Sequence, residues 1–161
     1  MGSDWSPVWW ALGAAVVVGV AGGLATRIGP WYFNLRKPSW QPPDWLFAPA
    51  WTAIYALTAL AGLRAWRAAP DHAGRGRVLV AYTVNALMNV LWSLLFFTLQ
   101  RPDWALAEVV ALGLSVALLI VVSGRLDRAA GWLLVPYLAW VAFAGVLNWS
   151  VADLNAPFSG P

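Results

Sequence analysis

The stretch VLVAYTVNALMNVLWSLLFFTL, residues 78–99, runs for 22 residues without a charged side chain. Together with Gln100 it fills the whole interval between Arg77 and Arg101. An α-helix needs about 20 residues to cross the roughly 30 Å hydrocarbon core of a bilayer. A helix also satisfies its own backbone hydrogen bonds, which an apolar solvent cannot do for it. The stretch therefore predicts a membrane-spanning helix.

Four other intervals of the chain have the same character. Residues 5–26, 45–63 and 129–152 carry no charge, and residues 104–124 carry only Glu108. We therefore expect an all-α membrane protein, a bundle of five transmembrane helices. The predicted spans are about 8–26, 46–66, 78–99, 104–124 and 131–151.

Composition agrees with this fold class and excludes several functions. The chain is 61% hydrophobic and 11% charged, against about 45–50% and 25% for soluble domains. Its 161 residues leave no room for a second domain, so we treat residues 1–161 as one transmembrane domain. The net charge of +3 comes from scattered arginines and does not favour nucleic-acid binding. Cysteine is absent and His72 is the only histidine, so we expect no metal site.

Lys and Arg are distributed unequally over the predicted loops. Six lie on the face that carries the N-terminus and four on the other face. Cytoplasmic loops carry the excess of basic residues in most membrane proteins. This distribution favours a bacterial plasma membrane and a cytoplasmic N-terminus.

Thirteen tryptophans are a large number for this length. Indole rings near span ends usually anchor a helix at the lipid headgroups. We assign that role to Trp5, Trp9, Trp10, Trp66, Trp132 and Trp149. The remaining tryptophans fall inside spans or in the first loop.

A polar and aromatic stripe follows one face of the third span: Tyr82, Asn85, Asn89, Trp92 and Phe96 recur at helical spacing. In lipid an amide must find a partner, so the stripe is expected to face inward. It serves either to bind helices to one another or to line a pocket.

Two other spans carry matching residues. Tyr137, Trp140, Ala144 and Asn148 share one face of the fifth span, which Pro136 is expected to bend near its start. Trp51 and Tyr55 lie one turn apart in the second. Stacked indoles with a few orienting amides suit a flat apolar ligand with some polar groups.

Two further features leave alternatives open. Glu108 is the one acid well inside a span, and it either caps a helix or forms a salt bridge, or it contacts a ligand or carries a proton. The motif Gly19-x-x-x-Gly23 permits close helix packing, within the bundle or at a dimer face.

The first loop, residues 27–45, is unusually long and rich in Pro and Trp. Its prolines favour an ordered, non-helical path, and its indoles are poorly hydrated. We expect it to fold over the bundle as a lid, with Trp31 or Trp40 above Trp51 and Trp140. The alternative is that its indoles lie at the headgroup interface.

The chain resembles a known family in three blocks. The first is WYFNLRKPSWQPPDW at 31–45 with Phe47, Trp51 and Tyr55 after it. The second is Asn89-x-x-Trp92 with Trp104-Ala105-Leu106, and the third runs from Pro136-Tyr137 through Trp140 to Leu147-Asn148. These blocks resemble the translocator protein family, also called tryptophan-rich sensory proteins or peripheral benzodiazepine receptors.

The resemblance implies a five-helix bundle, commonly a homodimer in lipid, that holds a porphyrin such as protoporphyrin IX or haem as a non-covalent ligand. Trp51 and Trp140 match two tryptophans implicated in porphyrin degradation by some bacterial members. The full set of expected ligand-binding residues is Trp31, Trp40, Phe47, Trp51, Tyr55, Asn89, Trp92, Trp104, Trp140, Ala144 and Leu147. The family's sterol motif is broken by Trp149 and Asp153, so cholesterol is not expected as a partner.

The leading functional hypothesis is a porphyrin-binding sensor or regulator of tetrapyrrole levels. One alternative is light- and oxygen-dependent porphyrin degradation that uses Trp51 and Trp140 as tentative catalytic residues. The other is transport of porphyrin or lipid. No conventional catalytic motif is present, so the sequence leaves open whether the chain is an enzyme.

Overall fold

The computed structural model describes residues 6–26 and 28–158, and within the first helix it describes only some side chains. The described chain is helical and contains no strand. The elements are α1 (Ser6–Ala25), α2 (Pro30–Asn34), the 3₁₀-helix η1 (Asp44–Leu46), α3 (Phe47–Ala68), α4 (His72–Ser93), the π-helix η2 (Leu94–Thr98), α5 (Pro102–Leu126), α6 (Arg128–Leu133) and α7 (Val135–Asn155).

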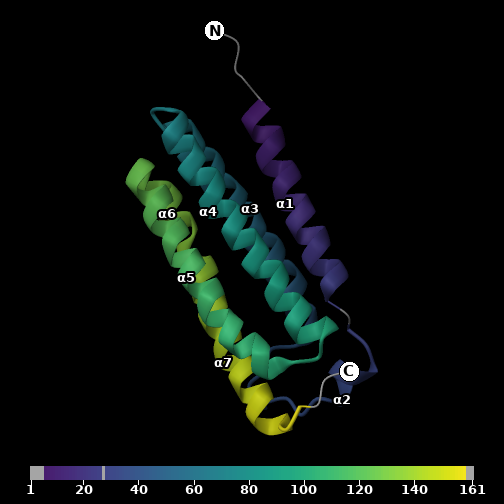
Figure 1. The fold of residues 1–161 in the computed structure, drawn as a ribbon. Coiled ribbons are helices and arrows are strands. Elements are labelled where there is room, and N and C mark those ends of the chain that lie inside the picture. The colour runs from purple at the N-terminus through teal and green to yellow at the C-terminus, as the bar shows by residue number, and fades with distance from the viewer. Residues whose placement is uncertain (1–5, 27, 159–161) are drawn as a thin grey trace.

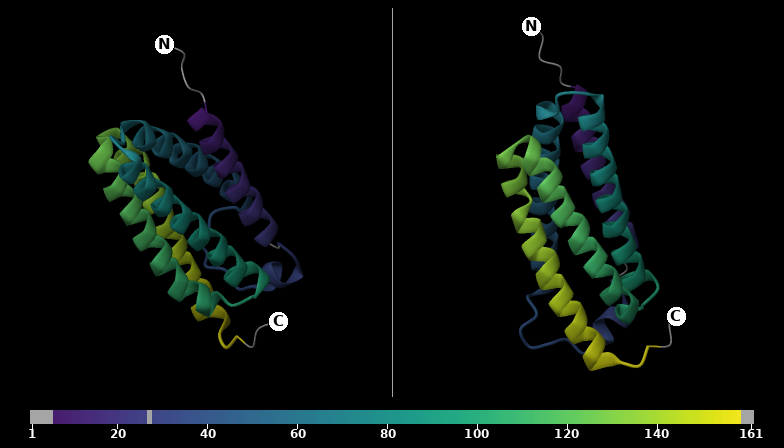
Figure 2. Two further views of the ribbon diagram at one scale, coloured as in Figure 1. Left: turned by 45° about the horizontal axis from the view of Figure 1, so that its top comes forward. Right: turned by 60° about the vertical axis from the view of Figure 1, so that its left-hand side comes forward.

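Four helical segments of the described chain are long and apolar enough to cross a membrane: Asp44–Ala68, His72–Thr98, Pro102–Leu126 and Arg128–Asn155. Three of them contain the predicted spans 46–66, 104–124 and 131–151, and His72–Thr98 covers the predicted span 78–99 except for Leu99. They run side by side along the long axis of the bundle, and α1 packs against α3 and α4 at its edge (Figures 1 and 2). The α3–α4 and α5–α6 turns lie at one end, and α2 and the end of α7 lie at the other.

The outer surface of the bundle is apolar. Large aliphatic side chains face outward from α4 and α5, among them Leu79, Val80, Val110 and Leu114, each more than half exposed. The buried side chains include three asparagines and several serines. Polar groups inside and apolar groups outside are what a lipid solvent requires.

The expected bend of the fifth span is a break between two helices. Pro136 lies in the first turn of α7 and has no backbone N–H. It therefore cannot donate to a carbonyl of α6, and the hydrogen bonding of α6 does not continue into α7. Leu134 forms the joint and is fully buried against Ala61, Ala65 and Leu119. The short helix α6 therefore closes this end of the bundle.

The sequence pattern predicts a regular α-helix to the end of the third span. The structure differs there. From Leu94 the backbone widens into a π-turn, in which Leu99 N–H donates to Leu94 O at 2.8 Å. Phe96 in this turn is buried, and the ring of Phe97 lies beside it, with ring centroids 4.8 Å apart. Such π-turns occur often at functional sites.

The prediction of a non-helical first loop is wrong for Pro30–Asn34 and Asp44–Leu46. Pro30 stands in the first turn of α2, where a fixed φ and a missing N–H cost nothing. The prediction of an ordered path is correct. Asp44 receives hydrogen bonds from the Tyr32 hydroxyl at 2.9 Å and the Gln41 amide at 3.0 Å, and its carboxylate lies 3.6 Å from Lys37 Nζ.

The two glycines of the α1 motif, Gly19 and Gly23, have different surroundings. A Cβ at Gly19 would lie 3.7 Å from the Tyr55 ring, whereas a Cβ at Gly23 would meet nothing within 4 Å. Gly19 therefore packs within the bundle. The homodimer stays a prediction.

Gly131 has the closest backbone contact of any described glycine, and a substitution there tests its effect on stability. A Cβ at Gly131 would lie 2.9 Å from Gly124 Cα and 3.2 Å from Ile120 O, both of which are backbone atoms. We expect Gly131→Ala to destabilise the protein by about 1–3 kcal/mol, because the α5–α6 pair must separate to admit the methyl group. Gly23→Ala is the matched control and is expected to be neutral or slightly stabilising. Thermal unfolding in one detergent measures both, and an unchanged midpoint for Gly131→Ala would contradict the close contact.

Candidate functional site

An aromatic group joins the first half of α3 to α7. Trp51 stacks on Tyr55, with ring centroids 5.4 Å apart and planes inclined by 27°. The Trp51 ring also makes edge contacts with Tyr137 at 6.1 Å and Trp140 at 6.4 Å. The two tryptophans singled out in the sequence therefore lie in direct contact, on different helices.

The same group extends to the first loop. The Trp140 ring lies 5.7 Å from Phe47 and 5.4 Å from Phe143, and Phe143 lies 6.0 Å from Trp40 of the loop. We call the connected rings the α3–α7 aromatic group, which consists of Trp40, Phe47, Trp51, Tyr55, Tyr137, Trp140 and Phe143. Trp40 is the loop tryptophan that reaches Trp140, and it does so through Phe143.

A second group lies around the π-helical end of α4. Trp92 stacks on Phe96 at 5.2 Å, and Trp31 of the loop meets Phe96 edge-on at 6.0 Å. The α4 aromatic group consists of Trp31, Tyr32, Phe33, Trp92, Phe96 and Phe97. Trp31 therefore belongs here and not above Trp140.

Asn89 is the polar centre that connects these helices. Its Oδ1 accepts a hydrogen bond from the Tyr55 hydroxyl of α3 at 3.1 Å. Its Nδ2 donates to the Tyr137 hydroxyl of α7, also at 3.1 Å. Asn89 is buried, so one amide links three helices away from water.

Similar bonds lie on either side of Asn89 along α4. Asn85 Nδ2 donates to Ser115 Oγ at 2.9 Å. Trp92 Nε1 donates to Asn148 Oδ1 at 3.1 Å, and Asn148 Nδ2 donates to Pro102 O at 2.8 Å. The stripe faces inward as predicted, and its amides bind helices to one another. The pocket-wall interpretation stays a prediction.

Glu108 does not cap a helix or form a salt bridge, contrary to the first of the two alternatives. Its side chain is buried, and neither carboxylate oxygen has a hydrogen-bond partner among the described residues. Arg101 and Asp103, the charged residues nearest along the chain, pair with each other instead. A ligand contact or a proton site remains as the other alternative for Glu108.

The other predicted site residues lie in different surroundings. Trp104 joins neither aromatic group: it is half-exposed, and the Arg101 guanidinium lies 4.1 Å from its ring centre. Leu147 packs against the cluster that contains Phe96. Ala144 lies one turn beyond Trp140 on α7 and is partly exposed.

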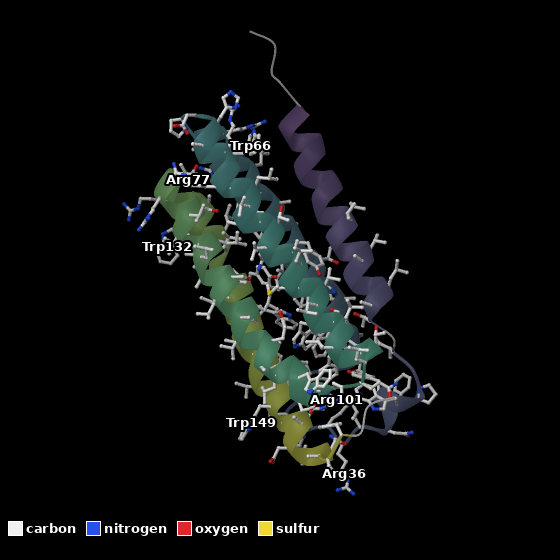
Figure 3. The ribbon with its side chains drawn as sticks, viewed as in Figure 1. Arg36, Trp66, Arg77, Arg101, Trp132 and Trp149 are labelled. Atoms are coloured by element: carbon white, nitrogen blue, oxygen red, sulfur yellow. The ribbon has the colours of Figure 1, made fainter. Side chains whose placement is uncertain are left out.

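The tryptophans expected at the membrane surface lie towards the two ends of the bundle. Trp66 and Trp132 lie near one end together with Arg77, and Trp149 lies towards the other, where Arg36 and Arg101 are found (Figure 3). Trp132 and Trp149 are well exposed. Of the other expected anchors, Trp5 and the side chains of Trp9 and Trp10 lie outside the described part of the chain.

One tyrosine of the first loop, Tyr32, has a shifted pKa. Burial, followed by the hydrogen bond to Asp44, raises the pKa of Tyr32 well above its ordinary value. Its hydroxyl donates to Asp44 Oδ1, and Lys37 Nζ lies 3.7 Å above its ring. No group of His, Asp or Glu in the described chain is arranged to hold a metal ion.

Two residues of this region escaped the sequence analysis. Phe143 lies three positions after Trp140, a helical spacing that could have placed it on the same side of α7. Asn155, the last residue of α7, bonds to the loop, and no sequence pattern marks it.

Comparison with known proteins supports the sequence resemblance. Residues 11–154 match the model of the TspO/MBR family. The chain is 37% identical over 150 residues to "Tryptophan-rich protein TspO" of Chlorobaculum tepidum, covering 89% of this chain and 92% of the relative. It is 37% identical over 155 residues to "Tryptophan-rich sensory protein" of Cereibacter sphaeroides, covering 96% and 95%. It is 34% identical over 157 residues to "Translocator protein" of Sus scrofa, covering 94% and 91%.

Two interior substitutions are expected to have opposite effects. Asn89→Leu leaves the Tyr55 and Tyr137 hydroxyls without their amide partner and should cost about 1–3 kcal/mol. Glu108→Leu removes a buried carboxyl that has no partner and should stabilise the protein by a similar amount. Thermal unfolding of both variants in the same detergent measures the difference. Destabilisation by Glu108→Leu would mean that the carboxyl makes a favourable contact in the native protein.

Proposed function

This chain belongs to the TspO/MBR family, and we propose that it binds porphyrins such as protoporphyrin IX, and related flat hydrophobic molecules, inside the helical bundle. We further propose that it acts as a sensor or regulator of tetrapyrrole levels. One relative carries the name "Tryptophan-rich sensory protein", which supports a sensory role.

The α3–α7 aromatic group is the observation that carries this proposal. A porphyrin is a large planar π-system, and indole and phenol rings bind such a surface by stacking and by edge contact. Trp51 and Tyr55 are already stacked in parallel, while Trp140 stands at 85° to Trp51. A planar ligand therefore has a parallel surface on one side and a ring edge on the other.

The hydrogen bonds around Asn89 add to this arrangement. They hold Tyr55 of α3 and Tyr137 of α7 in fixed positions, and both of these phenols contact Trp51. A site whose rings are fixed before binding loses less conformational entropy when the ligand arrives. The amide stripe thus supports a preformed ligand site, in addition to its role between helices.

We also propose that α1 is a fifth membrane span. Its 20 residues carry no charge and equal the length that a bilayer core requires. The basic residues at the α3–α4 and α5–α6 turns outnumber those at the loop end. The positive-inside rule therefore favours a cytoplasmic N-terminus in a bacterial plasma membrane.

Degradation of the bound porphyrin is a second candidate function, and the contact between Trp51 and Trp140 favours it. Their ring centroids lie 6.4 Å apart. A porphyrin stacked on one indole would therefore lie close to both. Light would excite the porphyrin and molecular oxygen would be the oxidant. One O2 would add across a carbon–carbon bond of the ring, that bond would break, and both oxygen atoms would end as carbonyl groups of the opened product. The two indoles, the oxidisable side chains beside the ring, would pass electrons from the porphyrin to oxygen and return to their starting state.

The binding proposal predicts quenching of tryptophan fluorescence when protoporphyrin IX is titrated into the purified protein. Trp140→Leu should weaken binding about three- to tenfold, the loss expected for one aromatic contact. Trp132→Leu is the matched control, because Trp132 is an exposed tryptophan that belongs to neither aromatic group and should leave affinity unchanged. Wild-type affinity no tighter than that of empty detergent micelles would refute the proposal.

The degradation proposal is tested by illuminating the protoporphyrin complex in air. Trp51→Phe and Trp140→Phe should each lower the yield of porphyrin product per bound ligand, because phenylalanine is a much poorer electron donor than tryptophan. Absorption spectra and mass spectrometry of the extracted pigment measure the yield. Equal yields in wild type and both variants would remove these indoles from the chemistry.

A further inference from the structure

The first loop is attached to the helical bundle by the last residue of α7. Asn155 Oδ1 accepts a hydrogen bond from the backbone N–H of Arg36, and Asn155 Nδ2 donates to the backbone carbonyl of Arg36. Both donor–acceptor distances are 2.8 Å, and the two residues are 119 positions apart in sequence. We call this pair of bonds the Asn155 clasp.

The clasp uses both the oxygen and the nitrogen of a side-chain amide. A side-chain amide offers one acceptor and two donor hydrogens, so it can pair with both backbone groups of a single residue. The second Nδ2 hydrogen of Asn155 donates to Val151 O, one turn back in α7, which orients the amide. Val151 is itself buried, so the clasp rests on a fixed part of the bundle.

The clasp differs in kind from the other polar contacts of the loop. Tyr32, Lys37 and Gln41 all bind Asp44, at the beginning of the second long helix, and so fold the loop upon itself. In the described chain, the only hydrogen bonds or ion pairs that join residues 28–43 to helices beyond η1 are those between Arg36 and Asn155. Separation of this pair would leave only apolar contacts across the junction.

Those apolar contacts lie on either side of Arg36 along the loop. Trp31 contacts Phe96 of the α4 aromatic group, and Trp40 contacts Phe143 of the α3–α7 aromatic group. Arg36 lies midway between the two tryptophans in sequence, so fixing its backbone restricts the position of both. The clasp is also accessible to water, because Asn155 borders an open hollow of about 310 Å³ at this end of the bundle.

We propose that Asn155 is a positioning residue for the ligand site: its clasp holds the loop closed, with Trp40 against Phe143, and breaking it allows the loop to lift. This proposal rests on the proposed porphyrin-binding function. Because water can replace both hydrogen bonds, the closed arrangement is favoured without being permanent. Ligand release would then depend on a residue that touches no ligand.

Limited trypsin digestion tests the clasp without any ligand. Trypsin cleaves after Arg36, and the carbonyl that it must attack is the one that Asn155 holds. We expect Asn155→Ala to raise the rate of cleavage at Arg36–Lys37 about tenfold, the effect of losing two exposed hydrogen bonds. Cleavage after Arg75 and Arg77, at the opposite end of the bundle, should not change and serves as an internal control.

Ser150→Ala is the matched control variant. Its exposed hydroxyl bonds only to Val146 O of its own helix, so its loss should leave the loop unchanged. Asn155→Asp provides a second variant, because it keeps the shape of the side chain and removes both donors. Circular dichroism checks that each variant retains its helical content.

Protoporphyrin IX release then tests the role of the clasp in the ligand site. We expect Asn155→Ala and Asn155→Asp to speed release about tenfold while association changes little, as measured by stopped-flow recovery of tryptophan fluorescence. Unchanged cleavage at Arg36–Lys37 in both variants would overturn the clasp. Faster cleavage with unchanged release would overturn its role at the site. If wild type binds no porphyrin, the proposed function fails, together with the positioning role that rests on it, while the cleavage rates still decide whether the clasp holds the loop.

Discussion

Asn89 satisfies both ends of its amide with phenols from two other helices, and much of the bundle geometry follows from this requirement. In lipid no water is present to replace a missing partner, so the amide must be bound by protein. Tyr55 and Tyr137 can reach it only if α3 and α7 have one relative rotation and height. That same arrangement brings Trp51 against Trp140. The constraint that orders the helices is therefore also the one that assembles the aromatic site.

Residue pattern was sufficient to predict the parts of the fold that lipid and helical periodicity determine. Uncharged stretches located the long helices, and the spacing of Asn85, Asn89 and Trp92 identified the buried face of α4. The break near Pro136 follows from the chemistry of that one residue. The π-turn after Ser93 could not be predicted in this way, because it contains no glycine or proline and depends on how the end of α4 meets its neighbours.

The residue types of the site could be predicted from the sequence. Which of these residues contact one another was harder to predict. Trp51, Tyr55 and Trp140 were expected together and lie together. Trp31 and Trp40 could not be told apart from sequence, since their positions depend on the path of a loop that is tied down at Asn155. For Glu108 the sequence left open a cap or salt bridge, suggested by its place early in a helix, and a ligand contact or proton site, and its carboxylate has no partner among the described residues. Whether a partner is within reach depends on neighbouring helices, and these carry no described basic side chain that reaches it.

The wide turn at Leu94–Thr98 bears on how chains of this kind can diverge. In this turn the N–H of residue i+5 donates to the carbonyl of residue i, so the turn contains one residue more than an α-helical turn. Deletion of that residue would restore ordinary helical bonding locally and would not disturb the amides that lie earlier in α4. Loss of a residue here would therefore keep Asn85 and Asn89 in register with their partners. An alignment gap at this point between two homologues would mark a change in the shape of the helix end and not a shift of the interior.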